Sequence, residues 1–464
     1  MIKRYLLAGL WTNVCLGLSA ALVLAVAAPG KIASAQDLGG LTPASPTGKH
    51  AHAVPAAPKP SLPPAFTIPV EPLGYSAPGA LYLGQLYTLT SLDFLDENRL
   101  LFTFRVPGLI HREHGAGSDE DSDEHHMRAL VLDISSGSVR AEAVWTLHDR
   151  ERYLSMLKDG HFLLRDGDSL QQGDATLTLK PMLRFPGPLL TVEVDPTQQF
   201  MVTNSREPLA ASKPSDDSSH DSSHDSSHVP SPATAAANVT VDGQKNSDST
   251  DIVVRILHRD TGQVMLVGHV PSTIHLPINA DGYLESLRAR EGKWLLNLNF
   301  FTGGSVQVGK VDSTCSPALD FIGPREVLAS TCNGWGEFKL VAMTTEGRRL
   351  WDKLMPSSQG WPRLVMAPNG TRLARETLAF SHPVDASHPF SREDIKGQIV
   401  EVFDAANGQI VLTAPANPPL DAGGNVGISP SGRRVAVLHG GELQIFELPA
   451  PPPLPDPSGS QPGR

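Results

Sequence analysis

The sequence repeats one local pattern seven times: a short apolar strand, a polar turn and a second strand of alternating polarity. The seven copies are Leu89–Phe104, Arg152–Arg165, Leu190–Thr203, Leu276–Arg288, Ala318–Ser330, Arg363–Arg375 and Asn425–His439. Each turn carries Asp, Asn, Gly or Pro, which favour tight turns, so each copy predicts a β-hairpin. A short hairpin cannot bury its apolar side chains by itself, so the copies are expected to stack on one another.

A second hairpin follows several of these copies. The clearest cases are Arg128–Trp145, Asp251–Val270, Phe338–Leu354 and Gln398–Ala414. Two hairpins per unit make a four-stranded antiparallel sheet. Turns near residues 281, 324 and 369 are 43 and 45 residues apart, a period typical of propeller blades. We predict an all-β fold, a seven-bladed β-propeller of four-stranded blades. The stretch GALYLGQLY from Gly79 is expected to supply the outer strand that closes the ring.

Several of these hairpins share the pattern D-x-x-x-G-x-[VI], and Gly347-Arg-Arg-Leu-Trp351 places a tryptophan four residues after a glycine. The chain therefore resembles the YVTN and quinoprotein-like propellers, which are akin to WD-repeat propellers. The Gly347 to Trp351 segment is similar to the docking signature of quinoprotein blades. The resemblance implies an architecture only, and it transfers no cofactor and no catalytic residue.

The first 35 residues predict export from the cytoplasm. Lys3 and Arg4 precede a mostly apolar run, Tyr5–Ala28, and Ala33-Ser34-Ala35 forms an A-x-A site. This pattern indicates a signal peptide cleaved after Ala35, and the alternative is a retained membrane anchor. The expected location is the bacterial periplasm or the medium.

Composition divides the remainder of the chain. Residues 36–75 are rich in Pro and Ala and are expected to be a disordered leader, and residues 451–464 a disordered Pro-rich tail. The propeller is expected at 76–450, interrupted by a low-complexity insertion at 205–249. Without Lys3, Arg4 and Lys31 the mature chain has 35 basic and 49 acidic residues, a formal charge of about −14. Nucleic acid and anionic membrane surfaces are therefore disfavoured partners. We expect a monomer that binds a protein, a glycan or a small ligand.

Two cysteines remain after cleavage, Cys315 and Cys332. They are equidistant from the turn at Gly323-Pro324, so hairpin symmetry places them opposite each other on neighbouring strands. In an exported chain this predicts a disulfide.

Three insertions fall between the second and third strands of their blades, at Pro107–His126, Ser205–Ser249 and Ser381–Lys396. Connections of this type all leave the same face of a propeller. Nine of the 17 histidines lie in these insertions, and DSSHDSSHDSSH spans Asp217–His228. The candidate metal ligands are His125, His126, His220, His224 and His228. The competing interpretation is a solvated loop without a specific role.

Linear motifs of hydrolases, metalloproteases and nucleotide-binding proteins are not found in the sequence. The leading hypothesis is therefore a non-enzymatic propeller that binds through its loop-bearing face. One alternative is a hydrolase or lactonase-like enzyme with a divalent metal in the central channel, for which Asp93, Glu193 and Asp320 are the candidate ligands. Another alternative is weak divalent-metal binding by the histidine-rich loops.

Deletion of Ser205–Ser249 is expected to leave the fold and the thermal midpoint nearly unchanged, because a connection between two strands on the propeller surface contributes little burial. Thermal unfolding followed by circular dichroism tests this expectation. A large loss of stability would show that the strands are ordered differently.

Overall fold

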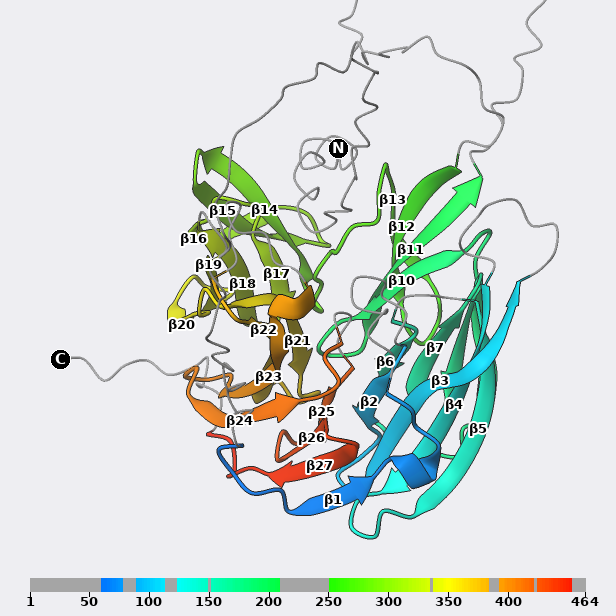
Figure 1. Ribbon diagram of the computed structural model, residues 1–464. Helices are drawn as coiled ribbons and strands as arrows, with labels where there is room; N and C mark the ends of the chain where they lie inside the picture. Colours follow the sequence, from blue (N-terminus) through cyan, green and yellow to red (C-terminus); the bar gives the residue numbers. More distant parts are fainter. Residues whose placement is uncertain are drawn as a thin grey trace, which may run out of the picture.

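The computed structural model describes residues 60–77, 89–112, 123–148, 152–208, 250–333, 337–383, 392–420 and 424–452. Within these ranges the chain forms seven antiparallel sheets arranged in a ring (Figure 1). Two short 3-10 helices, η2 (Glu71–Leu73) and η5 (Arg392–Asp394), accompany the strands. No helix among the described residues has the length and apolar character needed to cross a bilayer.

The protein is a seven-bladed β-propeller. Six of the seven predicted first hairpins are confirmed as inner strand pairs, and the one in blade 4 is reduced to a single bridge. Blade 1 is β2 (Ser91–Phe94), β3 (Arg99–Arg112), β4 (Asp123–Asp133) and β5 (Val139–Leu147), and blade 2 is β6 (Leu154–Met156), β7 (Phe162–Asp166), β8 (Ser169–Gly173) and β9 (Leu179–Arg184). Blade 3 is β10 (Leu189–Val194), β11 (Phe200–Pro208), β12 (Thr250–His258) and β13 (Val264–Val270).

Blades 4 to 6 follow the same order from the inside outwards. Blade 4 is β14 (Gly282–Arg290), β15 (Lys293–Phe300) and β16 (Ser305–Asp312), and an isolated bridge from Ile278 to Tyr283 marks its inner segment. Blade 5 is β17 (Ala318–Phe321), β18 (Glu326–Asn333), β19 (Glu337–Thr344) and β20 (Arg349–Leu354), and blade 6 is β21 (Gln359–Met366), β22 (Arg372–Phe380), β23 (Ile395–Asp404) and β24 (Ile410–Ala416).

Blade 7 closes the ring by joining distant parts of the sequence. It contains β25 (Val426–Ile428), β26 (Arg434–His439) and β27 (Glu442–Glu447), and its outer strand is β1 (Phe66–Pro69). Phe66 pairs with Ile445, and the blue β1 lies beside the red β27 in Figure 1.

A segment before the first hairpin therefore closes the ring, but the stretch from Gly79 was the wrong choice and lies outside the described residues. The expectation of a disordered leader through residue 75 is also wrong for β1. The proline content of this segment, including Pro69, favoured a disordered leader. An outer strand nevertheless tolerates proline, because its free edge needs no backbone N–H donor.

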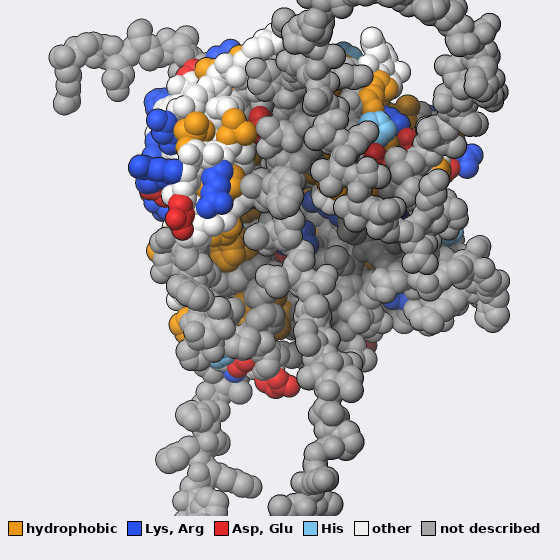
Figure 2. All heavy atoms as spheres, turned by 90° about the horizontal axis from the view of Figure 1, so that it is seen from above, with side chains coloured by type: hydrophobic (Ala, Val, Ile, Leu, Met, Phe, Trp, Pro, Cys, Tyr) orange, Lys and Arg blue, Asp and Glu red, His pale blue; other side chains and the backbone are white. Residues whose placement is uncertain are grey.

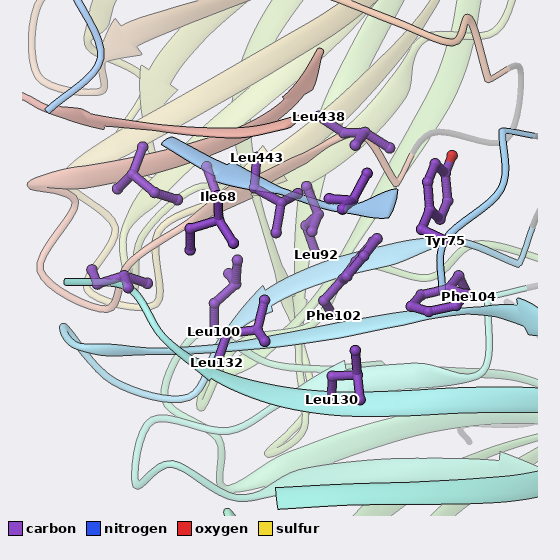
Figure 3. Packing of buried hydrophobic residues seen from close by; sticks show 14 of the residues in the cluster. Ile68, Tyr75, Leu92, Leu100, Phe102, Phe104, Leu130, Leu132, Leu438 and Leu443 are labelled. Atoms are coloured by element: carbon purple, nitrogen blue, oxygen red, sulfur yellow. The ribbon is translucent and has the colours of Figure 1, made fainter. Parts of the chain in front are cut away.

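Seven hydrophobic clusters hold the ring together, one between each pair of neighbouring blades. The cluster between blades 7 and 1 shows the principle: Ile68 of β1 and Leu443 of β27 belong to the same cluster as Leu100 of β3, and Ile68 lies over Leu100 (Figure 3). Alternate residues of each strand face opposite neighbours, so both faces of a blade are apolar. Each blade therefore depends on the two beside it.

Tryptophans on outer strands strengthen two of these contacts. Trp351 of β20 donates a hydrogen bond from Nε1 to the backbone oxygen of Ala405 in blade 6, at 2.7 Å. A Cβ at Gly408 would lie 2.6 Å from the Trp351 ring, so glycine is needed for this close approach. Trp145 of β5 contacts the ring of Phe162 in blade 2, with the two ring centroids 5.6 Å apart. The Gly347 to Trp351 segment thus docks one blade on the next, as the resemblance implied.

The three insertions lie between the second and third strands of blades 1, 3 and 6, as predicted, but their limits differ. In blade 1 the strands continue to Arg112 and resume at Asp123, so Ile110–Arg112 and Asp123–His126 belong to paired strands, beyond a register shift between Arg105 and Ile110. In blade 3, β11 continues to Pro208. A neutral deletion in blade 3 must therefore start at residue 209, because removal of Ser205–Pro208 shortens β11.

Two truncations test ring closure. Relative to a chain that begins at Gln36, removal of residues up to 59 should not change the thermal midpoint. Removal up to 75 also deletes β1 and the buried Ile68, Val70 and Tyr75, which should lower the unfolding free energy by at least about 5 kcal/mol. Urea unfolding measures both. Equal stability of the two truncated chains would show that β1 does not close the ring.

Candidate functional site

Three acidic residues occupy the same position on alternate inner strands. Asp93 of β2 is paired in its sheet with Leu101, Glu193 of β10 with Val202, and Asp320 of β17 with Leu328. They therefore sit at one level of blades 1, 3 and 5. The sequence hypothesis proposed these residues as channel carboxylates, and the structure places all of them on inner strands.

His275 brings two of these carboxylates together. It lies in the crossover from blade 3 to blade 4, directly before the inner segment of blade 4. Its Nδ1 is 2.8 Å from Oε2 of Glu193, and its Nε2 is 3.1 Å from Oδ1 of Asp320 and 2.8 Å from the backbone oxygen of Leu319. One imidazole therefore connects blades 3, 4 and 5.

The ionisation of His275 follows from this geometry. Burial around the imidazole lowers its pKa, but the hydrogen bonds and charges of Asp320 and Glu193 outweigh burial and hold the pKa well above the usual 6.5. Both ring nitrogens can then donate, one to each carboxylate. The imidazole is thus held between two carboxyl groups, a position that favours its protonated form.

Asp93 is held in a different environment. It is buried, it accepts a hydrogen bond from the Ser91 hydroxyl, and Oδ1 is 3.5 Å from Nη2 of Arg152. Burial raises the pKa of Asp93, while Arg152 and Ser91 oppose the rise. The neighbouring Tyr153 hydroxyl, 2.6 Å from Oγ1 of Thr103, completes a buried polar contact between blades 1 and 2.

Blade 6 carries a further buried acid, Glu376 of β22. It is the sheet partner of the exposed Arg363 on β21. Burial raises the pKa of Glu376 to about 8, against the opposing charge of Arg363. Its two carboxyl oxygens have no hydrogen-bond partner of good geometry among the described residues. Glu376 is therefore protonated at neutral pH.

Charges of opposite sign thus follow one another around the inner strands of blades 1 to 6. We call this set the inner charge ring, and its members are Asp93, Arg152, Glu193, His275, Asp320 and Arg363. The ion pairs within this set join blade 1 to blade 2 and blade 4 to blades 3 and 5. These charges therefore hold neighbouring blades together. Within the described ranges, no group of three or more His, Cys, Asp or Glu side chains is arranged to hold a metal ion.

The sequence hypothesis missed the cations of this ring. Arg152 and Arg363 are the first residues of two of the repeated hairpins, and His275 directly precedes a third. A basic residue at the start of an inner strand was the available signal.

The candidate metal ligands are not brought together by the described residues. His125 and His126 are consecutive in β4, so they point to opposite sides of the sheet. His125 is buried, whereas His126 Nδ1 lies 3.3 Å from Oγ1 of Thr146. His220, His224, His228 and the cleavage site at Ala35 lie outside the described residues.

The predicted disulfide between Cys315 and Cys332 is present, with Cα atoms 5.6 Å apart. Cys332 lies on β18, but Cys315 precedes β17 rather than lying on it. The backbone N–H of Thr314 also donates to the oxygen of Cys332, at 2.9 Å. The bond therefore fastens the crossover between blades 4 and 5 to the second strand of blade 5.

Fold and inner ring together define a propeller scaffold. No family model matches the sequence, and no curated protein matches it. The structure is similar to the acylaminoacyl peptidase of Pyrococcus horikoshii (8% identity, TM-score 0.44), with 79% of this chain spanning 52% of that one.

Two isolated propeller domains are also similar. The propeller domain of the Trilobed protease from Pyrococcus furiosus is 8% identical (TM-score 0.40; 77% of this chain and 93% of that chain). The Cps50 (Swd1) propeller of Myceliophteria thermophila is 12% identical (TM-score 0.39; 77% and 95%). At these identities the likeness is one of fold alone, and the propeller architecture of this chain follows from its own seven sheets.

Substitution of His275 by Gln tests the inner ring. Because the folded-state pKa of His275 exceeds the unfolded one, its stabilisation is complete below pH 6.5 and is lost as pH rises through the folded-state pKa. The variant should be less stable than wild type by about 1–2 kcal/mol near pH 6, after allowance for its partial exposure. The difference should shrink in alkaline solution. Urea unfolding across this pH range measures it.

His148→Gln is the matched control, because His148 contacts a single carboxylate, Asp166, at the surface. It should change stability much less. A His275→Gln penalty that is independent of pH would rule out the charged bridge.

Proposed function

We propose that this protein is an exported, non-enzymatic scaffold that recognises its partner through the loop-bearing face of the propeller. The observation that carries the proposal is the grouping of the long connections. Blades 1, 3 and 6 join their second and third strands through residues 113–122, 209–249 and 381–394, and the strand ends that these connections join lie on one face of the ring. The same connection in blades 2, 4 and 7 is only two residues long.

The base of the blade 3 connection is rigid. Nη1 of Arg255 lies 2.6 Å from Oε1 of Glu207 and 2.9 Å from Oγ of Ser205. Burial raises the pKa of Glu207, but the hydrogen bonds from Arg255 and Ser205 and the charge of Arg255 lower it by more, so the pKa of this carboxyl lies below its usual value. Variable loops on rigid strand ends are the usual arrangement for recognition. The scaffold already fixes the ends of each loop, so less conformational entropy is lost when a partner binds.

The base of the blade 6 connection is also tied down. The backbone N–H of Ser381 donates to the oxygen of Asp394 at 2.8 Å, and the Ser381 hydroxyl contacts Oδ1 of Asp394 at 3.1 Å. Nε2 of His382 lies 3.4 Å from the same carboxylate oxygen. A histidine counted in the third insertion is therefore engaged in closing the loop base.

Surface charge supports a partner that is not a strongly acidic polymer. The whole sequence has a formal charge of −11. On the side seen in Figure 2, basic and acidic side chains of the described residues are interspersed with hydrophobic ones. A protein or glycan partner fits this mixed surface better than nucleic acid does.

The alternative of a channel metalloenzyme is less well supported. Two of its three candidate ligands, Glu193 and Asp320, share the cation of His275. A divalent ion bound by both carboxylates would have to displace that imidazole from at least one of them.

Loop replacement tests the proposal. In one variant, residues 113–122, 209–249 and 384–391 are replaced by short turns, which should leave the thermal midpoint nearly unchanged. Wild type and variant are applied to a glycan array and a displayed peptide library. We expect ligands bound by wild type to lose at least about 1.4 kcal/mol, a tenfold loss of affinity, in the variant.

The control is Asp281→Ala with Glu346→Ala, two exposed residues in turns on the opposite face. It should bind as wild type does. Retention of binding by the loop-replaced variant would contradict the proposal. Stoichiometric metal in protein purified without an affinity tag, lost with Glu193→Gln and Asp320→Asn, would favour the enzyme instead.

A further inference from the structure

A carboxyl group is buried where the last blade meets blade 6. We call the contact between blades 6 and 7 the closing seam, and its apolar members include Ala374 of β22, Val400 of β23 and Val426 of β25. Glu376 of β22 is 1% exposed. It lies two residues after Ala374 and is the sheet partner of Val400, so it points into the closing seam.

The polar side chains of the closing seam are engaged with other groups. Nε2 of Gln398 donates to the backbone oxygen of Leu420 at 2.8 Å, and Oε1 accepts from the backbone N–H of Leu420 and from Nδ2 of Asn425, each at 2.9 Å. Asn425 Nδ2 also donates to the backbone oxygen of Pro418 at 2.6 Å. Neither carboxyl oxygen of Glu376 has a hydrogen-bond partner of good geometry among the described residues.

This situation distinguishes Glu376 from the other buried acids. The acids buried in the described part of the chain are Asp93, Asp195, Glu207, Glu376 and Asp404. The other four have a hydrogen-bond or ion-pair partner. A buried carboxylate without such a partner is strongly disfavoured, so the ionised form of Glu376 is the least compensated of the five.

The charges around the closing seam do not change this conclusion. The charged and titratable side chains on this side of the neighbouring strands are Arg363 of β21, Arg372 of β22, Asp404 of β23, His439 of β26 and Glu442 of β27, while β24 and β25 contain none.

Arg372 and Asp404 pair with each other at 2.9 Å. Burial holds the pKa of His439 below its usual 6.5, so this imidazole is uncharged above pH 7. The charge of the exposed Arg363 and the backbone N–H of Asn425 lower the pKa of Glu376, but burial outweighs both and raises it to about 8.

Opening of the closing seam therefore releases a proton. A glutamate carboxyl in water has a pKa of 4.5. Between that value and about 8, the closed seam holds a proton that the open seam gives up. The closed form is thus favoured most in acid, and its advantage falls as pH rises through this interval. The equilibrium constant for opening should increase by up to about tenfold per pH unit.

We propose that the closing seam is a proton-linked switch, in which separation of blade 7 from blade 6 is coupled to release of the Glu376 proton. Acid keeps the two blades together, and rising pH favours their separation. Blade 7 lies between blades 6 and 1 and joins the two ends of the propeller sequence (Figure 1), so its release opens the ring. This switch does not depend on the loop-bearing face.

Glu376→Gln tests the proposal, because the carboxamide has the shape of the carboxyl group but no ionisable proton. Urea unfolding of wild type and variant is compared from pH 5 to pH 8. The unfolding constant of wild type divided by that of the variant should rise by at least about 100-fold across this range. Glu376→Leu, which also lacks the proton, should give the same pH profile and replaces the glutamine variant if that chain does not fold.

Hydrogen exchange shows where the ring opens. At pH 8 the amides of β25 and β26 should exchange faster in wild type than in Glu376→Gln, whereas those of β14 and β15 in blade 4 should not differ. Comparison of the two chains at one pH cancels the intrinsic pH dependence of exchange.

Glu401→Gln is the matched control, because Glu401 lies in the same sheet but contacts Arg375 on the side that faces blade 5. It should keep the pH dependence of wild type, and so should His439→Gln above pH 7. A ratio that is independent of pH, loss of the pH dependence in His439→Gln, or an equal change of exchange in all seven blades would each overturn the proposal.

Discussion

Ring closure is the constraint on which this structure depends. The two faces of each blade are apolar, and each of the seven hydrophobic clusters is shared by two consecutive blades. Without closure, the faces of the first and last blades would be left in water. The pairing of β1 with β27 prevents this, because Ile68 covers one end of the cluster between blades 7 and 1. The inner charge ring then adds polar contacts where the blades meet the axis.

Much of the fold could be predicted from local sequence, because a hairpin is a local structure. The seven turns and the alternating strands beside them were sufficient to find six of the seven inner strand pairs. The outer strand β1 was not found, since its pairing partner lies almost 380 residues away and its own four residues include a proline. Composition indicates whether a segment has enough apolar residues to form its own hydrophobic core. An edge strand that packs on the core of another part of the chain does not need that composition, so composition does not reveal it.

The site was predictable only in part, for a related reason. Asp93, Glu193 and Asp320 could be placed on inner strands because their position within each hairpin is the same. Their partners come from the adjoining blades, and that proximity depends on how the sheets pack. His125 and His126 were wrongly grouped as metal ligands because they are adjacent in sequence. Adjacent residues of a strand point to opposite sides of the sheet. The disulfide was predictable, because its two cysteines flank a single hairpin.

The origin of blade 7 from both ends of the propeller sequence has a consequence for folding. Its outer strand is made first during synthesis and its inner three strands last, so β1 has no partner until residues near 445 have been made. Six blades can form beforehand, but the apolar faces that flank the missing blade stay open. Such a long-range final contact is slow to form. An incomplete ring therefore exposes apolar surface that can aggregate or bind chaperones. This surface is buried only when the last blade has formed.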